Sequence, residues 1–263
     1  MSRTTHWEGE PARVWAEVWG VPEVEAWTRL GSTNARAREL IGEGEARPWT
    51  VVLADEQTHG RGREGRLWSS PPEGGLWFSV IVPVRAEAVG LLPLRTGVAV
   101  LGVLRGLRGL DDLGLKWPND LWWRDRKAGG ILCEGVGDHA IVGIGINTGT
   151  PADEAFDVRP VGLEEIVEGR VSRASLMGAL VARLRGALAG GGARLTVEEM
   201  ARLDALDQLR DRAVRCDPGP GGVARGFAPD GALRIETGRG IRSVYAGSVR
   251  PLGPKPRPTT GTG

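Results

Sequence analysis

Cysteine and histidine are scarce in this chain. The two cysteines, Cys133 and Cys216, are far apart and form no C-x-x-C pair, so neither a disulfide framework nor a zinc ribbon is indicated. The three histidines, His6, His59 and His139, never fall in an H-E-x-x-H pattern, and a histidine-based metal site is therefore not expected. A reduced, cytoplasmic compartment fits this composition best.

Long apolar runs and an excess of one charge are also lacking. No apolar stretch approaches the ~18 residues of a membrane span, and the first residues, MSRTTHWE, carry charge where a signal peptide needs an apolar core. We expect a protein that is neither exported nor embedded in a membrane. The 34 Lys and Arg balance 33 Asp and Glu, for a net charge of +1, so a nucleic-acid partner would require a local basic patch.

The 263 residues are enough for one large domain and one small domain. Residues 33–43 predict a helix with an N-cap candidate at Ser32 or Thr33. Apolar residues at helical spacing between 176 and 188 predict a helix with one face in the core. The other expected elements are strands over 49–54, 76–82, 113–117, 130–136 and 141–146, and a buried helix over 90–107.

The pattern changes after about residue 213 to short alternating runs separated by turns. Asp230-Gly231 lies between the runs 223–227 and 232–236, and both residues tolerate a positive φ, so a hairpin is indicated. We predict a small β-barrel of SH3-like size. The last residues, 253–263, lack an apolar anchor and are expected to be disordered.

A glycine-rich loop, Gly60-x-Gly62-x-x-Gly65, matches the dinucleotide-binding fingerprint and resembles the glycine loop of protein kinases. Its context contradicts both interpretations. A dinucleotide-binding loop opens a helix, whereas residues 66–72, RLWSSPP, break one, and the further kinase motifs are missing. Taken alone, the loop could be an ordinary surface loop.

Cationic side chains occur together with glycines in two parts of the sequence. The first is GRGREGRLW over 60–68, and the second is KWPND over 116–120 followed by RKAGGIL over 126–132. Backbone rich in glycine lets main-chain N–H groups and cationic side chains crowd one anion, such as a phosphate. Five motifs occur in a fixed order. They are STN at 32–34, DEQTHGRGR at 55–63, KWPND at 116–120, RKAGGILCE at 126–134 and VGIGIN at 142–147.

Together these motifs resemble the biotin protein ligases, and the likeness spans roughly residues 28–250. The resemblance implies an α+β fold, a mixed sheet with flanking helices like that of class II synthetases, plus the SH3-like C-terminal barrel. We therefore expect an N-terminal extension over 1–24, a catalytic biotin- and ATP-binding domain over 25–212, the barrel over 213–252 and a disordered tail over 253–263.

The resemblance also implies the reaction. Such ligases join the biotin carboxylate to the α-phosphate of ATP, and then pass biotin from the adenylate to one lysine of a biotin carboxyl carrier protein. Two anions must meet before they react, which explains cationic groups at the site. Mg²⁺ arriving with ATP would need oxygen ligands, and no fixed metal site is expected.

The family's functional residues map onto this sequence through the motifs. The implied catalytic residues are Lys127, Arg61, Arg63 and Asp120. Those implied to bind biotin are Ser32, Thr33, Asn34, Gln57, Gly60, Arg61, Gly62, Arg63, Lys127 and Gly130. Those implied to bind ATP are Arg63, Trp68, Lys116, Trp117, Asn119, Asp120, Lys127 and Asn147.

Each assignment has a plainer alternative. Ser32 or Thr33 can cap a helix, with or without binding biotin. Lys127 could belong to a solvated turn, and Trp68 and Trp117 could be core tryptophans. By the resemblance, Trp68 ends the loop that closes over the adenylate, and Asp120 is a candidate acceptor for the proton of the attacking lysine.

The sequence departs from the family pattern at two points. Ala128-Gly129-Gly130 replaces the commoner Leu-Ala-Gly after the lysine, and Ala35 stands where a polar residue often follows Ser-Thr-Asn. Both changes could loosen the fit of the substrate, but they leave the charged groups in place.

Two other functions are compatible with parts of this pattern. A lipoate–protein ligase shares the architecture, but the GRGR and KWPND runs argue against it. A biotin-responsive transcriptional repressor carries an N-terminal winged helix, and only 31 residues precede Ser32, so no nucleic-acid partner is expected. The expected partners are biotin, ATP and the carrier protein, and a homodimer is left open.

Overall fold

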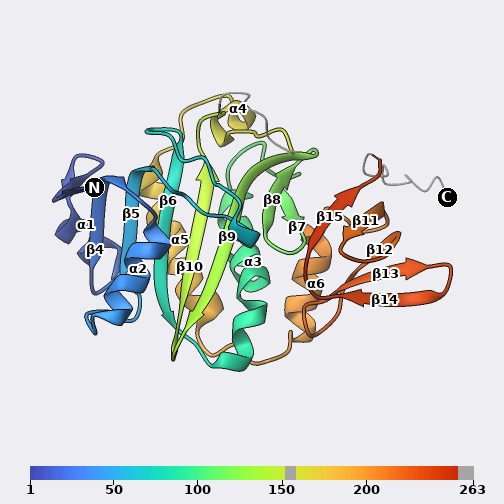
Figure 1. The fold of residues 1–263 in the computed structure, drawn as a ribbon. Coiled ribbons are helices and arrows are strands. Elements are labelled where there is room, and N and C mark those ends of the chain that lie inside the picture. The colour runs from blue at the N-terminus through green and yellow to red at the C-terminus, as the bar shows by residue number, and fades with distance from the viewer. Residues whose placement is uncertain (152–157, 254–263) are drawn as a thin grey trace.

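The computed structural model describes residues 1–151 and 158–253, and its centre is an eight-stranded mixed sheet (Figure 1). β4 and β5 run parallel, and the other neighbouring strands of this sheet run antiparallel. In spatial order the strands are β1 (Ser2–Thr4), β4 (Val24–Leu30), β5 (Val51–Gln57), β6 (Gly75–Pro83), β10 (His139–Asn147), β9 (Arg126–Val136), β8 (Asp120–Trp123) and β7 (Gly114–Lys116). The strands predicted at 49–54, 76–82, 113–117, 130–136 and 141–146 are confirmed.

The two faces of the sheet follow the alternation of side chains along each strand. In β6, Phe78 and Val80 belong to the large core, which also receives residues of α1 (Ala12–Trp19), α3 (Leu92–Leu104) and α5 (Arg173–Leu188). Ile81 lies on the opposite face, in a smaller cluster with Ala37 and Leu40 of α2 (Thr33–Gly42). The predicted helix at 33–43 thus covers the second face of the sheet.

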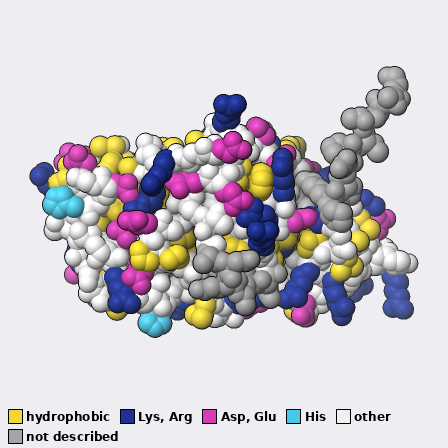
Figure 2. Space-filling model, turned by 90° about the horizontal axis from the view of Figure 1, so that it is seen from above, with side chains coloured by type: hydrophobic (Ala, Val, Ile, Leu, Met, Phe, Trp, Pro, Cys, Tyr) yellow, Lys and Arg dark blue, Asp and Glu magenta, His cyan; other side chains and the backbone are white. Residues whose placement is uncertain are grey.

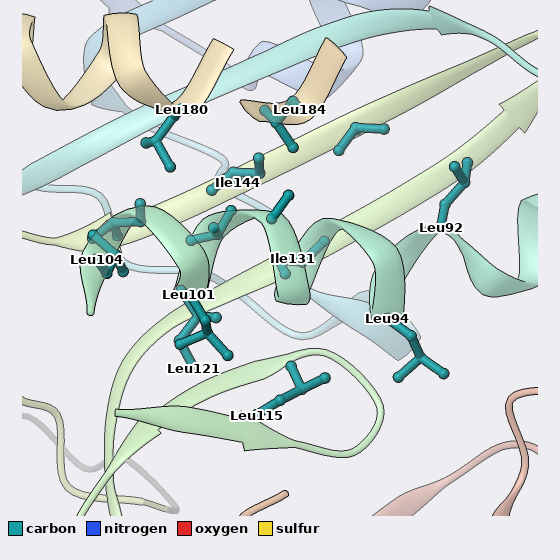
Figure 3. Packing of buried hydrophobic residues seen from close by; sticks show 14 of the residues in the cluster. Leu92, Leu94, Leu101, Leu104, Leu115, Leu121, Ile131, Ile144, Leu180 and Leu184 are labelled. Atoms are coloured by element: carbon teal, nitrogen blue, oxygen red, sulfur yellow. The ribbon is translucent and has the colours of Figure 1, made fainter. Parts of the chain in front are cut away.

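Helix α3 lies in the middle of the large core. Figure 3 shows its leucines between Leu180 and Leu184 of α5 on one side and Leu115 and Leu121 on the other. Together with the preceding 3-10 helix η2 (Ala86–Leu91), α3 is the one helical stretch of the described residues that is long and apolar enough to cross a membrane, and 61% of that window is buried. The buried helix predicted over 90–107 is confirmed, but the expectation that no apolar stretch approaches the length of a membrane span is wrong for this segment, which packs as a core helix.

A second, five-stranded antiparallel sheet ends the described chain. The turn at Asp230-Gly231 joins two of its strands, with Gly231 at φ 85°, which confirms the predicted hairpin. Helix α6 (Val197–Leu206) leads into this sheet and begins with a capping box between Thr196 and Glu199. The strands are β14 (Gly240–Val244), β13 (Leu233–Thr237), β12 (Gly221–Phe227), β11 (Ala213–Asp217) and β15 (Ser248–Pro251). The tail expected to be disordered lies, from residue 254, outside the described residues.

The N-terminal residues, expected only as an extension over 1–24, contribute an edge strand of the main sheet. β1 pairs with β4, and a small hairpin of β2 (His6–Trp7) and β3 (Glu10–Pro11) follows it. Trp7 lies edge-on to Trp19 of α1, with ring centroids 5.7 Å apart, and both are buried. These tryptophans anchor the N-terminal residues on the core.

Charged side chains of both signs share the surface. Figure 2 shows Lys and Arg interspersed with Asp and Glu on the face that it draws. Exposed pairs such as Arg29–Glu56 at 3.2 Å and Arg124–Asp112 at 3.0 Å contribute to this pattern. The mixture agrees with the net charge of +1.

Candidate active site

Glycines of β9 and β10 form the floor of a pocket on the face of the sheet that α2 covers. Gly130 and Gly145 lie opposite each other in the ladder, and Trp68 lies on them. A Cβ on Gly145 would come 2.7 Å from Trp68 Nε1, and a Cβ on Gly130 would come 3.1 Å from Trp68 Cζ3. The absence of side chains at these two positions therefore makes room for an aromatic ring against the strands.

The N-terminus of α2 supplies one polar wall of this pocket. Ser32 Oγ accepts a hydrogen bond from the Ala35 N–H at 3.4 Å, so Ser32 is the N-cap. Gln57 Oε1 accepts from the Thr33 N–H at 2.9 Å, and Gln57 Nε2 donates to Ser70 Oγ at 2.8 Å. Ser32, Thr33, Asn34 and Gln57 all line the pocket, so capping and lining are combined at Ser32.

The glycine-rich loop folds over the pocket as a closed turn. The Trp68 N–H donates to Gly60 O at 2.9 Å, and the Gly62 N–H donates to Arg66 O at 2.8 Å. Only the short 3-10 helix η1 (Arg63–Gly65) forms here, so the loop does not open the helix that a dinucleotide-binding fingerprint requires. A Cβ on Gly60 would lie 2.4 Å from Trp68 O, so Gly60 closes the base of the loop, outside the lining of the pocket.

Three charged side chains of β7, β8 and β9 meet at the end of the pocket. Asp120 Oδ1 lies 2.7 Å from Lys127 Nζ, and Asp120 Oδ2 lies 3.3 Å from Lys116 Nζ. Burial alone would raise the pKa of Asp120, but attraction to Lys127 and Lys116 holds it below its ordinary value. Burial lowers the pKa of Lys116, and Lys127 lowers it further. The cluster therefore brings two lysine side chains to one carboxylate.

Trp68 and Lys127 connect the floor of the pocket to this cluster. Lys127 Nζ lies 5.1 Å from the centre of the Trp68 ring, within the range of a cation–π contact. The Trp68 ring also lies edge-on to Trp77, with centroids 6.2 Å apart. Arg61 and Arg63 line the same pocket, and Arg63 Nη1 donates to Gly247 O beyond the C-terminal strand β14 at 3.4 Å.

A second cavity, of about 800 Å³, adjoins the first. Trp68, Lys116, Asp120 and Lys127 line both cavities, so the charged cluster stands where they meet. Asn147 lines the second cavity and donates through Nδ2 to Lys127 O at 3.1 Å. Two ligands in these cavities would therefore face each other across Lys127.

Two of the residues expected near ATP have mainly structural contacts. Trp117 is 1% exposed, lines neither cavity, and donates through Nε1 to Gly231 O in the C-terminal sheet at 3.0 Å. Asn119 lines the first pocket, and its Nδ2 donates to Ile131 O at 2.7 Å. In this structure Trp117 has the contacts of a core tryptophan, as the plainer reading of the sequence allowed.

Metal binding by the protein alone has little support in the described residues, which hold no group of three or more His, Cys, Asp or Glu side chains that could bind a metal ion. Asp120 is a carboxylate at the junction of the cavities, and two ammonium groups already occupy its oxygens. This donor set fits a Mg²⁺ ion only if phosphate and water oxygens supply most of its ligands.

Sequence reasoning missed several residues of the pocket. Gly143 and Leu132 line the pocket. Ser79 is fully buried and contacts Asn34, a residue of the pocket wall. The alternation of Gly143 and Gly145 along one strand was a usable signal, because a strand with glycines on one face leaves space there. The position of Ser79 carried no such signal.

Comparison with known proteins agrees with this geometry. The profile of the biotin/lipoate A/B protein ligase family matches residues 27–147. The chain is 34% identical over 233 residues to the bifunctional ligase/repressor BirA of Salmonella typhimurium, covering 84% of this chain and 71% of the relative. It is 29% identical to the biotin–[acetyl-CoA-carboxylase] ligase of Mycobacterium tuberculosis, covering 88% and 89%. The chain belongs to the biotin/lipoate A/B protein ligase family.

Solved structures of the family share its fold. The biotin protein ligase of Aquifex aeolicus in complex with biotin and ATP superposes with a TM-score of 0.75 at 27% identity, over 88% of this chain and 99% of that one. The ligase of Leishmania major in complex with biotinyl-5-AMP gives a TM-score of 0.62 at 26% identity, over 88% and 99%. The mixed sheet, its helices and the C-terminal antiparallel sheet together form the biotin ligase fold.

Proposed function

We propose that this chain is an ATP-dependent biotin protein ligase. A biotin carboxylate oxygen attacks the α-phosphorus of ATP, and the bond to pyrophosphate breaks, which leaves biotinoyl-5'-AMP. The amine of a carrier lysine then attacks the acyl carbon, AMP leaves, and the amine loses a proton. The observation that carries this proposal is the cluster of Lys127 with Asp120 and Lys116 at the junction of two cavities.

The first cavity suits biotin. Its polar wall includes Ser32, Thr33, Asn34 and Gln57. The amides of Asn34 and Gln57 are bonded to protein groups, and the hydroxyls of Ser32 and Thr33 suit a ureido ring, which has both donors and an acceptor. The ring of Trp68, which lies on the glycine floor and lines this cavity, suits contact with an apolar ring. We assign to Arg61, Arg63 and Gly62 of the loop, and to Gly130 of the floor, contacts along the same ligand.

The second cavity suits ATP. Lys127 at the junction can contact the carboxylate and the α-phosphate together, which positions two anions and stabilises charge that develops at phosphorus. Lys116 and Asn147 line the ATP side, and Asn119 lies nearby. Mg²⁺ bound to the triphosphate would screen the phosphate charge. Trp117 supports this region from the core.

Asp120 has two successive roles in this proposal. Its lowered pKa keeps it ionised, so in the free site it holds the ammonium groups of Lys116 and Lys127 in place. When Lys127 turns to the bound anions, one carboxylate oxygen becomes available to accept the proton of the attacking carrier lysine. Asp120 therefore first holds the two lysine side chains and later accepts the proton of the carrier lysine.

We also propose an acceptor protein, a cellular compartment and a division of the chain into two units. The acceptor is the biotin domain of a carboxylase, the enzyme works in the cytoplasm, and residues 25–212 and 213–252 form a catalytic and a C-terminal unit. Membership of a family that uses biotin and ATP supports the first assignment. The sparse cysteines support the second, and the separate C-terminal sheet supports the third.

Pyrophosphate exchange tests the function directly. Purified protein with ATP, Mg²⁺ and labelled pyrophosphate should exchange label into ATP when biotin is added, and should label a biotin carrier domain at lysine. Lipoate offered in place of biotin serves as the matched control. Exchange that responds to lipoate while biotin is inert would contradict the proposal.

A further inference from the structure

Asn34 in the pocket wall is held from three strands at once. Its Oδ1 lies 2.6 Å from Ser79 Oγ of β6. Its Nδ2 donates to Glu134 Oε2 at 2.6 Å and to Leu132 O at 3.3 Å, both in β9. Gly143 of β10 lies beneath it, where a Cβ would come 2.1 Å from Asn34 Oδ1. Asn34 is 4% exposed, so nearly all of its amide is committed to these contacts.

Glu134 sets the orientation of this amide. A carboxylate and a backbone carbonyl both accept hydrogen bonds only, so the side of Asn34 that faces Glu134 and Leu132 must be its NH₂ group. The amide oxygen is thereby turned toward Ser79. Arg38, one helical turn after Asn34, donates to the other oxygen of Glu134 at 2.8 Å and holds the carboxylate in place.

Because the Asn34 amide oxygen is fixed in place, it also determines the directions in which the Ser79 and Thr33 hydroxyl groups donate their hydrogens. Ser79 Oγ is 2.6 Å from the Asn34 oxygen, which can only accept, so Ser79 donates there. Ser79 has a single hydrogen, so its 2.7 Å contact with Thr33 Oγ1 requires Thr33 to donate. Gln57 Oε1, 3.2 Å from Thr33 Oγ1, still accepts from the Thr33 N–H at 2.9 Å. The Thr33 oxygen keeps its lone pairs for the pocket.

We propose that Glu134 is a positioning residue for biotin recognition. Acting through Asn34 and Ser79, it turns the Thr33 hydroxyl into an acceptor, which selects a ligand that offers an N–H group at that point, as a ureido ring does. Glu134 itself is outside the lining of the pocket. The inference rests on the proposed ligase function, and it adds a residue that acts on the ligand through two others.

The first experiment separates binding from chemistry in Glu134→Ala. Without the carboxylate only the longer contact with Leu132 O holds the Asn34 amide in this orientation, and loss of about one oriented hydrogen bond predicts a KM for biotin about tenfold higher. The kcat at saturating biotin and the KM for ATP should stay within about twofold. Glu236→Ala, which removes the Arg225 partner in the C-terminal sheet, is the matched control and should leave all three values unchanged.

A swap of the two side chains gives a second test. In Asn34→Asp, two carboxylates face each other, and biotin binding should fall by more than tenfold. Adding Glu134→Gln restores a donor toward residue 34 while the glutamine oxygen still accepts from Arg38. The double variant should therefore recover most of the biotin affinity that the single variant loses. Thermal melting of every variant shows whether the protein is folded.

The outcomes separate this inference from the proposed function. If the wild-type protein exchanges pyrophosphate with biotin, but folded Glu134→Ala keeps its KM, the positioning role is wrong. If Glu134→Ala lowers kcat and raises both KM values alike, or the double variant is no better than Asn34→Asp, Glu134 is only structural and the inference again fails. If the wild-type protein ignores biotin, the function itself is wrong.

Discussion

Lys127 Nζ lies 2.7 Å from Asp120 Oδ1, so in the unliganded site the lysine proposed to contact both substrates is paired with a carboxylate. Substrate anions must compete with Asp120 for this ammonium group. Lys127 Nζ also lies 5.1 Å from the centre of the Trp68 ring. The charge needed for catalysis is thus placed before the substrates bind, which reduces the cost of organising it during the reaction.

Replacing Lys127 tests this arrangement. Lys127→Ala should slow adenylate formation by about 10- to 100-fold, because a charge-assisted contact of roughly 1.5–3 kcal/mol is lost in the transition state. Single-turnover formation of biotinoyl-5'-AMP measures the effect. Arg124→Ala removes a cation three residues earlier, on an exposed pair with Asp112, and should behave as wild type. Adenylate formation at the wild-type rate in Lys127→Ala would refute the assigned role.

Arg63 should affect retention of the product more than its formation. It sits on the loop over the pocket and reaches Gly247 O near the C-terminal sheet, so Arg63→Gly removes a contact that holds the loop down. We expect faster escape of biotinoyl-5'-AMP and indiscriminate biotinylation of nearby lysines. A filter-binding assay measures the rate at which biotinoyl-5'-AMP is released from the protein. A variant that holds the adenylate as tightly as wild type would show that Arg63 has another role.

Gly143 should tolerate no side chain. A Cβ there would lie 2.1 Å from Asn34 Oδ1 and 2.9 Å from its Cγ, so Gly143→Ala should displace Asn34 and weaken biotin binding about tenfold or more. Gly135→Ala in the neighbouring strand is the control, since its nearest contact would be an ordinary 3.5 Å to Val89. Titration calorimetry with biotin compares the two variants. Equal affinities would mean that the pocket can repack.

Acid should weaken the fold partly through Glu165 in α4 (Leu163–Val167). Hydrogen bonds from Arg126 and then Thr150 lower its pKa from 4.5 to about 2. Because the folded-state pKa is the lower one, this carboxylate stabilises the protein above pH 4.5 and loses that contribution as the pH falls toward 2. Glu165→Gln should therefore melt lower at pH 7 and show a smaller drop in Tm between pH 6 and pH 3. Glu45→Gln, in an exposed loop, should keep the wild-type profile.

The loop over residues 58–72 should become resistant to protease when substrates bind. Leu67 is 86% exposed, and the turn is closed mainly by its own backbone hydrogen bonds. Contacts of Arg61 and Arg63 with biotin and ATP would add restraints from outside the loop. Trypsin cleavage at its arginines, followed by mass spectrometry, should decrease sharply with both ligands present. Unchanged cleavage would argue against closure.

The sequence predicted the elements whose cause is local. Helix α2 begins at Thr33 after a Ser32 cap, as expected, because capping depends on adjacent residues. The hairpin at Asp230-Gly231 was likewise predictable, since its turn places a glycine, Gly231, at a positive φ. The order of residues within one short segment is enough to predict a helix cap or a hairpin turn.

Long-range partners were not predictable in this way. The resemblance of KWPND to the family motif implied that Trp117 binds ATP, yet Trp117 lines neither cavity and packs in the core against the C-terminal sheet. Glu134 and Ser79 meet Asn34 only because β9, β10 and β6 are adjacent. Nothing in the spacing of these residues along the chain shows which strands pair, and so the outer support of the pocket emerged only from the structure.

The bond from Trp117 Nε1 to Gly231 O ties the segment that carries Asp120 to the turn of the C-terminal hairpin. A buried indole N–H that loses its acceptor costs about 1–3 kcal/mol. A chain shortened before that hairpin would thus leave the tryptophan next to Lys116, which lines both cavities, with an unsatisfied donor and a gap at its side. Deletion of the C-terminal sheet should consequently impair adenylation itself, even for free biotin and ATP with no carrier protein present.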